Sequence, residues 1–200
     1  MPESRIDISL FDPRTTYDRG RPLAVELLWY FLKMVFFLSA FPWPARFRSI
    51  ILSTFGATLC RNVYIKPRVN IHFPWRISIG DNTLIGEGVE IYNFAPVIIG
   101  ANCCLSQRAF VCAANHDFRD PAMGYRHAPV TICDGAWIGA CSFVGPGTLV
   151  GVDVVVTAGS VVTKDLPHGM VCSGNPCLPV KPRWKDGKNG EPSNPAPGSV

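Results

Sequence analysis

Aliphatic residues return every six positions through the central part of the chain. A helix repeats every 3.6 residues and a single strand every two, so neither explains this pattern. A parallel β-helix does, because each of the three short strands in a coil points one aliphatic side chain inward. The repeating residues are Ile65, Ile71, Ile79, Ile85, Ile91, Ile99, Leu105, Val111, Ile132, Ile138, Val144, Val150, Val156 and Val162. The pattern predicts an all-β solenoid over residues 59–184.

Glycine often follows the repeating aliphatic residue, as at positions 80, 86, 100, 139, 145 and 151. We expect these glycines to let the chain turn tight corners at positive φ. Four positions after the aliphatic residue come small or β-branched side chains such as Thr83, Cys103 and Ser142.

One long excursion interrupts the repeat. Ile79 and Ile99 are twenty residues apart, whereas Ile99 and Ile132 are thirty-three apart. The additional residues fall in 115–129, which are polar, aromatic and rich in turn formers. Loops that leave a rigid scaffold are frequent carriers of function, so this segment is the first place to search for a site.

The first 58 residues form an N-terminal unit of a different character. Residues 1–22 read as an extended arm, and residues 23–44 are apolar and aromatic apart from Glu26 and Lys33. These two charges and the FPWP sequence at the end argue against a transmembrane helix. Two interpretations stay open: a helix that packs on the end of the solenoid, and a helix in a membrane interface with arginines near its ends. A second short helix is predicted over residues 45–55.

Composition limits the remaining possibilities. Residues 185–200 are rich in Pro, Gly, Ser and Asn, which predicts a disordered tail. The net charge of +4 is too small to indicate nucleic acid. Eight cysteines without a CxxC pair favour reduced thiols, and the polar start of the chain shows no cleavable signal peptide, so we expect a cytoplasmic protein.

His116 is the candidate general base, because it opens the excursion directly after a predicted strand. An imidazole at that point is held on one side and open to solvent on the other, and its ordinary pKa lies near neutrality. Asn115, Asp117 or a backbone carbonyl could fix its tautomer.

Several motifs together resemble the left-handed β-helix O-acetyltransferases, in particular those of the colanic-acid exopolysaccharide type. These motifs are the hexapeptide repeat, the ANHD sequence at the excursion, WIG at 137–139, AGSVVTKD at 158–165 and the later GNP and KPR sequences. The N-terminal DxSxF sequence, the apolar segment and Pro74-Trp75 add to the likeness, which covers about residues 5–184. The implied fold is a left-handed parallel β-helix with an N-terminal helical segment and an irregular C-terminal tail.

The resemblance implies a homotrimer with its active site in a cleft between subunits, and acetyl-CoA as co-substrate without a metal. His116, assisted by Asp117, would deprotonate a hydroxyl of a sugar or lipid-linked glycan, and backbone N–H groups would hold the oxyanion. Positions that match cofactor contacts in the family are Trp137, Gly139, Ala140, Ala158, Thr163, Lys164, Asn175, Lys181 and Arg183.

The acceptor is less defined by the resemblance. Galactoside acetyltransferases carry Asn and Ser where this chain has Gly86 and Ala140, which argues against a simple galactoside or maltose enzyme. We expect Glu87, Tyr92 and Asn93 to contact the acceptor instead. The alternatives are acetylation of a xenobiotic or other small molecule, a non-catalytic β-helix scaffold, and a zinc enzyme like the γ-carbonic anhydrases. The zinc alternative is weak, because the expected second histidine of the loop is replaced by Pro121.

Overall fold

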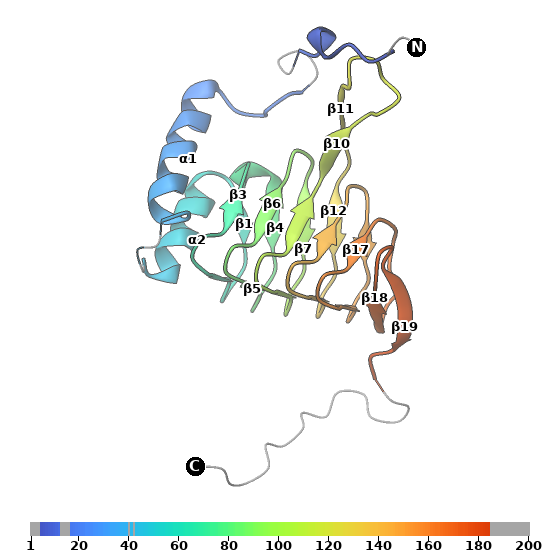
Figure 1. Ribbon diagram of the computed structural model, residues 1–200. Helices are drawn as coiled ribbons and strands as arrows, with labels where there is room; N and C mark the ends of the chain where they lie inside the picture. Colours follow the sequence, from blue (N-terminus) through green and yellow to red (C-terminus); the bar gives the residue numbers. More distant parts are fainter. Residues whose placement is uncertain (1–4, 13–16, 40, 42, 185–200) are drawn as a thin grey trace.

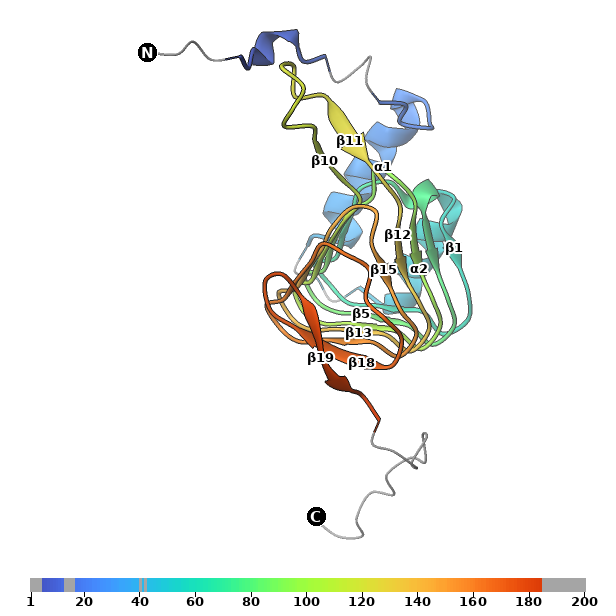
Figure 2. The ribbon, with the colours of Figure 1, turned by 90° about the vertical axis from the view of Figure 1, so that its right-hand side faces the viewer.

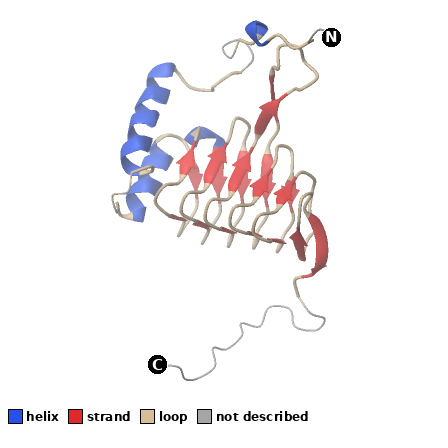
Figure 3. Ribbon diagram, viewed as in Figure 1, coloured by secondary structure: helices blue, strands red, loops and turns tan. Residues whose placement is uncertain are grey.

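The computed structural model describes residues 5–12, 17–39, 41 and 43–184. Figures 1 and 3 show a solenoid of short strands with helices at its N-terminal end and a hairpin projecting from one side. The predicted tail at 185–200 lies outside the described residues.

Three parallel sheets form the walls of the solenoid, and each coil contributes one strand to each sheet in turn. The first sheet contains β1 (Thr58–Leu59), β4 (Ile77–Ile79), β7 (Val97–Ile99), β12 (Val130–Ile132) and β15 (Leu149–Val150). The second contains β2 (Tyr64–Ile65), β5 (Leu84–Ile85), β8 (Cys104–Leu105), β13 (Trp137–Ile138), β16 (Val155–Val156) and β18 (Met170–Ser173), with β19 (Leu178–Pro182) antiparallel at its edge. The third contains β3 (Asn70–Ile71), β6 (Glu90–Tyr92), β9 (Phe110–Cys112), β14 (Phe143–Val144) and β17 (Val161–Val162).

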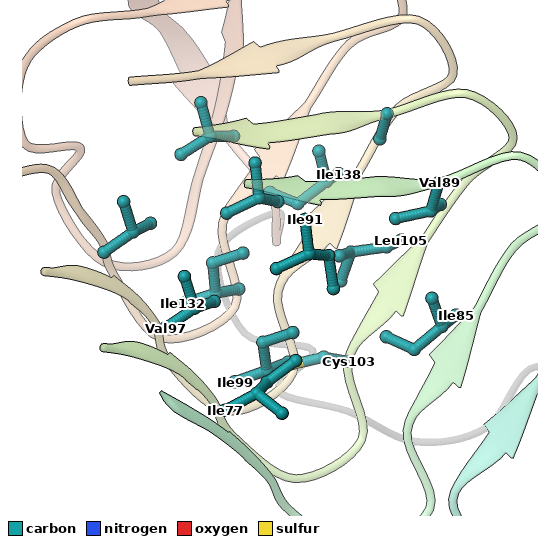
Figure 4. Packing of buried hydrophobic residues seen from close by; sticks show 14 of the residues in the cluster. Ile77, Ile85, Val89, Ile91, Val97, Ile99, Cys103, Leu105, Ile132 and Ile138 are labelled. Atoms are coloured by element: carbon teal, nitrogen blue, oxygen red, sulfur yellow. The ribbon is translucent and has the colours of Figure 1, made fainter. Parts of the chain in front are cut away.

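The six-residue pattern is confirmed as the core of this solenoid. All fourteen repeating aliphatic residues are buried, none with more than 2% of its surface exposed. Figure 4 shows several of them pointing into the same interior, where equivalent side chains of successive coils stack. The small polar residues of the repeat are also buried, and Thr83 Oγ1 donates to the Gly100 carbonyl at 2.8 Å.

The expected reason for the repeated glycines is wrong. The glycines at 80, 86, 100, 139, 145 and 151 do not have positive φ; that conformation falls two residues later, as at Asn82 and Asn102. The glycines are required by close packing of coils instead. A Cβ on Gly80 would lie 2.5 Å from the backbone nitrogen of Ala101, and one on Gly139 would lie 2.5 Å from that of Ala158.

The excursion is an antiparallel hairpin of β10 (Ala114–His116) and β11 (Tyr125–His127), rather than an irregular loop. Both ribbon views show it standing away from the body of the solenoid, and Figure 2 looks toward the opposite end from the helices. The N-terminal arm, with the short helix η1 (Ile8–Leu10), meets the hairpin, where the Asp7 N–H donates to the Pro121 carbonyl.

Helix α1 (Leu23–Phe36) packs against the first coil, which confirms one of the two expectations for the apolar segment. Trp29 is buried, and its indole N–H donates to the carbonyl of His72 at 2.9 Å. Helix α2 (Ala45–Thr54) follows, and buried Arg48 donates to the Phe36 carbonyl at the end of α1. The short helix η2 (Pro74–Arg76) turns the first coil into the second.

We predict that acid weakens the contact between α1 and the first coil through His72. Burial, and then the charge of Lys33, lower the pKa of this imidazole from 6.5 to about 4. Glu90 Oε1 lies 3.7 Å from His72 Nε2, but this carboxylate is half exposed and does not offset the other two effects. A depressed histidine pKa gives stability above the unfolded pKa that is lost as pH falls toward the folded one. The free energy of unfolding should therefore be about 2 kcal/mol lower at pH 5 than at pH 7 through this group.

Urea unfolding at the two pH values measures this effect. The variant His72→Asn should lose most of the His72 contribution, whereas His168→Asn, at an exposed histidine, should keep it. An unchanged pH dependence in His72→Asn would contradict the assignment.

Candidate active site

The turn of the β10–β11 hairpin is held by Asp120. Its carboxylate accepts from the backbone N–H groups of Ala122 at 3.0 Å and Gly124 at 2.8 Å. Met123 between them adopts φ 50°, a left-handed conformation that is uncommon outside glycine. This arrangement turns the carbonyl of Met123 back toward the strand that carries His116.

The Met123 carbonyl fixes the tautomer of His116. His116 Nδ1 lies 2.5 Å from this oxygen, and the side chain is otherwise exposed. A carbonyl oxygen only accepts hydrogen bonds, so Nδ1 carries the proton and the neutral ring keeps its lone pair on Nε2. Nε2 is therefore the atom available to take a proton from a bound molecule.

The Asp117 side chain is not the group that fixes the His116 tautomer. Its Oδ1 accepts from the Arg119 backbone N–H at 3.0 Å, and its own N–H donates to the Gly124 carbonyl. The side chain thus stabilises the loop beyond His116, and the orientation of the imidazole is set by the backbone.

Aromatic side chains form a wall beside His116, which the sequence pattern did not single out. Phe11 of the N-terminal arm contacts both His116 and Tyr125, with ring centroids 5.5 and 5.1 Å apart. Phe94 lies 5.3 Å from Tyr125 and stacks on Tyr92 at 4.5 Å. We call Phe11, Tyr125, Phe94 and Tyr92 the aromatic wall. It combines three segments that are distant in sequence, so no local motif predicts it.

The three residues expected to contact an acceptor are separated in the structure. Tyr92 is in the aromatic wall. Glu87 lies at the corner between the second and third sheets and pairs with Arg68 at 3.1 Å. Asn93 is fully buried, and its amide exchanges hydrogen bonds with the backbone N–H and carbonyl of Phe73. The expectation for Asn93 is therefore corrected, because its side chain is held inside the solenoid.

The small residues expected along the pantetheine path share one corner of the solenoid. Gly139 and Ala140 follow β13, Ala158 follows β16 in the next coil, and Gly159 N–H donates to the Ala140 carbonyl at 2.9 Å. Ala140 borders a cavity of about 400 Å³ with Glu87, Gln107 and Arg108. Trp137 on the adjoining strand is 48% exposed, and its indole donates to Ser106 Oγ at 2.8 Å.

Thr163 and Lys164 lie exposed after β17, at the corner from which the hairpin also leaves. Thr163 borders a cavity of about 490 Å³ with Asn115, Arg126 and Phe143. The structure thereby places Thr163, a predicted cofactor residue, on the same cavity as Asn115, which directly precedes His116.

The three predicted cofactor residues near the C-terminal end differ in their exposure and contacts. Asn175 is exposed in the turn between β18 and β19, and Lys181 is exposed on β19. Arg183 contacts the solenoid: its guanidinium donates to the Gly135 carbonyl at 2.7 Å and lies 3.7 Å from Asp153 Oδ1. The contact of Arg183 with a CoA phosphate stays a prediction, since these two partners involve only Nη1 of its guanidinium.

Within one chain, the candidate residues form two groups at different corners. His116, Tyr92, Thr163 and Lys164 lie where the third sheet passes to the first; Ala140, Ala158 and Glu87 lie where the second passes to the third. Within the described part of the chain, no group of three or more His, Cys, Asp or Glu side chains is placed to hold a metal ion.

Known proteins with similar sequences also carry the hexapeptide repeat. The family model for the hexapeptide repeat of succinyl-transferase matches residues 76–106 and 129–164, on either side of the hairpin. The chain is 33% identical over 180 residues to the putative colanic acid biosynthesis acetyltransferase WcaF of Escherichia coli K12, covering 88% of this chain and 97% of that protein.

The chain belongs to the hexapeptide-repeat acetyltransferases. Galactoside O-acetyltransferase of E. coli K12 is 29% identical over 67% of this chain and 68% of its own length. The solved structure of galactoside acetyltransferase in complex with coenzyme A superposes with a TM-score of 0.73 at 26% identity, covering 84% of this chain and 89% of that one. A hexapeptide-repeat acetyltransferase from Vibrio cholerae also gives 0.73 at 26% identity, over 81% and 92% of the two chains.

These relatives confirm the predicted left-handed parallel β-helix and an acetyl-CoA-dependent acetyltransferase. The residues present fit coenzyme A: Gly139, Ala140 and Ala158 add little side-chain volume where they lie, and a Cβ on Gly159 would meet nothing within 4 Å. Thr163 and Lys164 would offer a hydroxyl and a fixed positive charge to its phosphates.

The tautomer of His116 is directly testable. We predict that, at a pH where the rings are neutral, His116 carries its proton on Nδ1. His168 is the internal control, because its Nδ1 accepts from the Val152 N–H at 2.8 Å and its proton must therefore lie on Nε2. Long-range ¹H–¹⁵N correlation spectra distinguish the two forms. A His116 ring protonated on Nε2 would contradict the proposed geometry.

Proposed function

We propose that this acetyltransferase transfers the acetyl group of acetyl-CoA to a hydroxyl of a sugar in an exopolysaccharide or its lipid-linked precursor. The observation that carries the proposal is the His116 imidazole, exposed and held by the Met123 carbonyl with its free lone pair on Nε2. A ring in this state accepts a proton without a change of tautomer or orientation.

In the proposed reaction, His116 Nε2 takes the proton of the acceptor hydroxyl as its oxygen attacks the thioester carbonyl. The new C–O bond forms and the C–S bond breaks, and the imidazolium returns the proton to the departing CoA sulfur. Backbone N–H groups stabilise the negative charge that develops on the carbonyl oxygen. At the end of the reaction, His116 is neutral again, and no other side chain has gained or lost a proton.

The aromatic wall supports a sugar as the acceptor. Sugar rings present faces of C–H groups, and these pack on aromatic rings while the hydroxyls keep their hydrogen bonds. Tyr125 and Phe11 both touch the His116 ring, so a sugar seated on them would bring a hydroxyl close to Nε2. The names of the relatives point the same way, since one is a putative colanic acid biosynthesis enzyme and another acts on galactosides.

We further propose that the working unit is a homotrimer whose active sites lie between subunits. The two corners described above carry complementary parts of the chemistry, the base on one and the small-residue path for pantetheine on the other. A symmetric assembly that sets one corner against the other corner of a neighbour would complete each site. Thr163 and Lys164 would then contact the CoA phosphates from the His116 side.

The cytoplasm is the proposed location of the reaction. All eight cysteines are free, and burial raises the pKa of Cys103 to about 11, so its thiol stays protonated as a small apolar group. Unpaired thiols in this number suit a reducing compartment.

We predict that His116→Gln lowers the rate of acetyl transfer by roughly 10²–10⁴, because the general base is removed while the binding surface is kept. Transfer from acetyl-CoA to a panel of sugars and nucleotide sugars, detected by mass, measures the rate. His168→Gln is the matched control and should transfer at the rate of the wild type, since His168 lies outside both groups.

Three results would contradict parts of this function. Wild-type rates in His116→Gln would remove His116 as the base. Transfer confined to non-carbohydrate small molecules would replace the sugar acceptor. Failure of the wild type to bind coenzyme A in calorimetry would contradict the catalytic function as a whole.

A further inference from the structure

Helix α1 is oriented with its polar residues inward and its apolar residues outward. Glu26 and Lys33 are buried with Trp29 against the first coil, and Glu26 pairs with Arg19 at 2.8 Å. The outward face consists of large apolar side chains, each more than half exposed. These are Leu23, Leu27, Leu28, Tyr30, Phe31 and Met34.

Further exposed apolar side chains follow α1 in the sequence. Phe41 is 57% exposed between the helices, and Phe47 and Ile50 on α2 are 50% and 62% exposed. We call these three side chains and the outward face of α1 the helical patch. Figure 1 shows both helices at one end of the solenoid, far from β19 at the other end. Soluble monomers rarely leave so many adjoining large apolar residues uncovered.

The charge around the helical patch is positive. Residues 17–66 contain seven Lys or Arg; two of these, Lys33 and Arg48, are buried, and two others, at positions 19 and 61, pair with carboxylates. Arg21, just before α1, and Arg46, on the first turn of α2, are exposed at the edges of the patch, and Lys66 is exposed on the adjoining coil. An apolar surface with a basic rim is complementary to an anionic lipid surface.

We propose that the helical patch binds in the interface of an anionic bilayer, with α1 lying flat and its apolar side chains between the lipid headgroups. Among the described residues, no helix is long and apolar enough to cross a membrane, so the contact is with one leaflet. A second copy of the chain fits less well, because two such patches face to face would oppose their basic rims. This inference does not rest on the acetyl acceptor or on the role of His116.

Vesicle flotation tests the proposal. The wild type should float with vesicles of phosphatidylcholine and phosphatidylglycerol, and less with phosphatidylcholine alone. The variant Leu27→Ser/Phe31→Ser removes two side chains from one face of α1 and should weaken binding roughly tenfold or more. Arg46→Gln should weaken binding to the anionic vesicles by about fivefold, an effect that disappears in high salt.

The matched control is Leu178→Ser/Val180→Ser, which removes two equally exposed apolar side chains from β19. It should bind vesicles as the wild type does. Circular dichroism and light scattering on every variant report the fold and the oligomeric state. Absence of wild-type flotation, or equal binding by the α1 variant, would overturn the proposal. So would a change of oligomeric state in the α1 variant with vesicle binding intact, which would assign the patch to a second copy.

Discussion

Close stacking of one coil on the next is the constraint on which the rest of this molecule depends. The backbone N–H groups of each coil donate to carbonyls of the next, and the aliphatic column inside fixes the register. The approach is so close that a Cβ at Gly80 or Gly139 would collide with the neighbouring backbone. A solenoid built in this way is a rigid support, and its corners repeat at constant positions from coil to coil.

The β10–β11 hairpin is anchored at both ends in this rigid solenoid. Because β9 and β12 remain in the sheets on either side, the ends of the insertion are fixed, and only its own turn must be ordered. Asp120 and the backbone of Met123 supply that order and direct a carbonyl at His116 Nδ1. The chemistry of the imidazole thus follows from main-chain geometry, which explains why Asp117 is not needed as its partner.

The sequence was sufficient to predict what repeats locally. The aliphatic positions, the break in the repeat and His116 at the mouth of the insertion all follow from spacing. Contacts between distant segments could not be read in the same way. The aromatic wall joins the N-terminal arm to two later segments. Asn93 hydrogen-bonds to the backbone of the preceding coil, and Arg183 donates to the Gly135 carbonyl. The sequence also did not predict which face of α1 points outward, because the composition of the helix does not show that Glu26 and Lys33 turn inward.

In the proposed trimer, a site divided between two corners would give the assembly a chemical purpose, because neither corner carries both the base and the small-residue path. Mixing two inactive variants tests this claim most directly. His116→Gln lacks the base, and Ala140→Trp would fill the small-residue path at the other corner. Subunits refolded together should assort at random and restore about one quarter of the wild-type sites. Acetyl transfer in the mixture far above that of either variant alone is the predicted result. No recovery, although native mass spectrometry detects mixed trimers, would show that each site lies within one subunit.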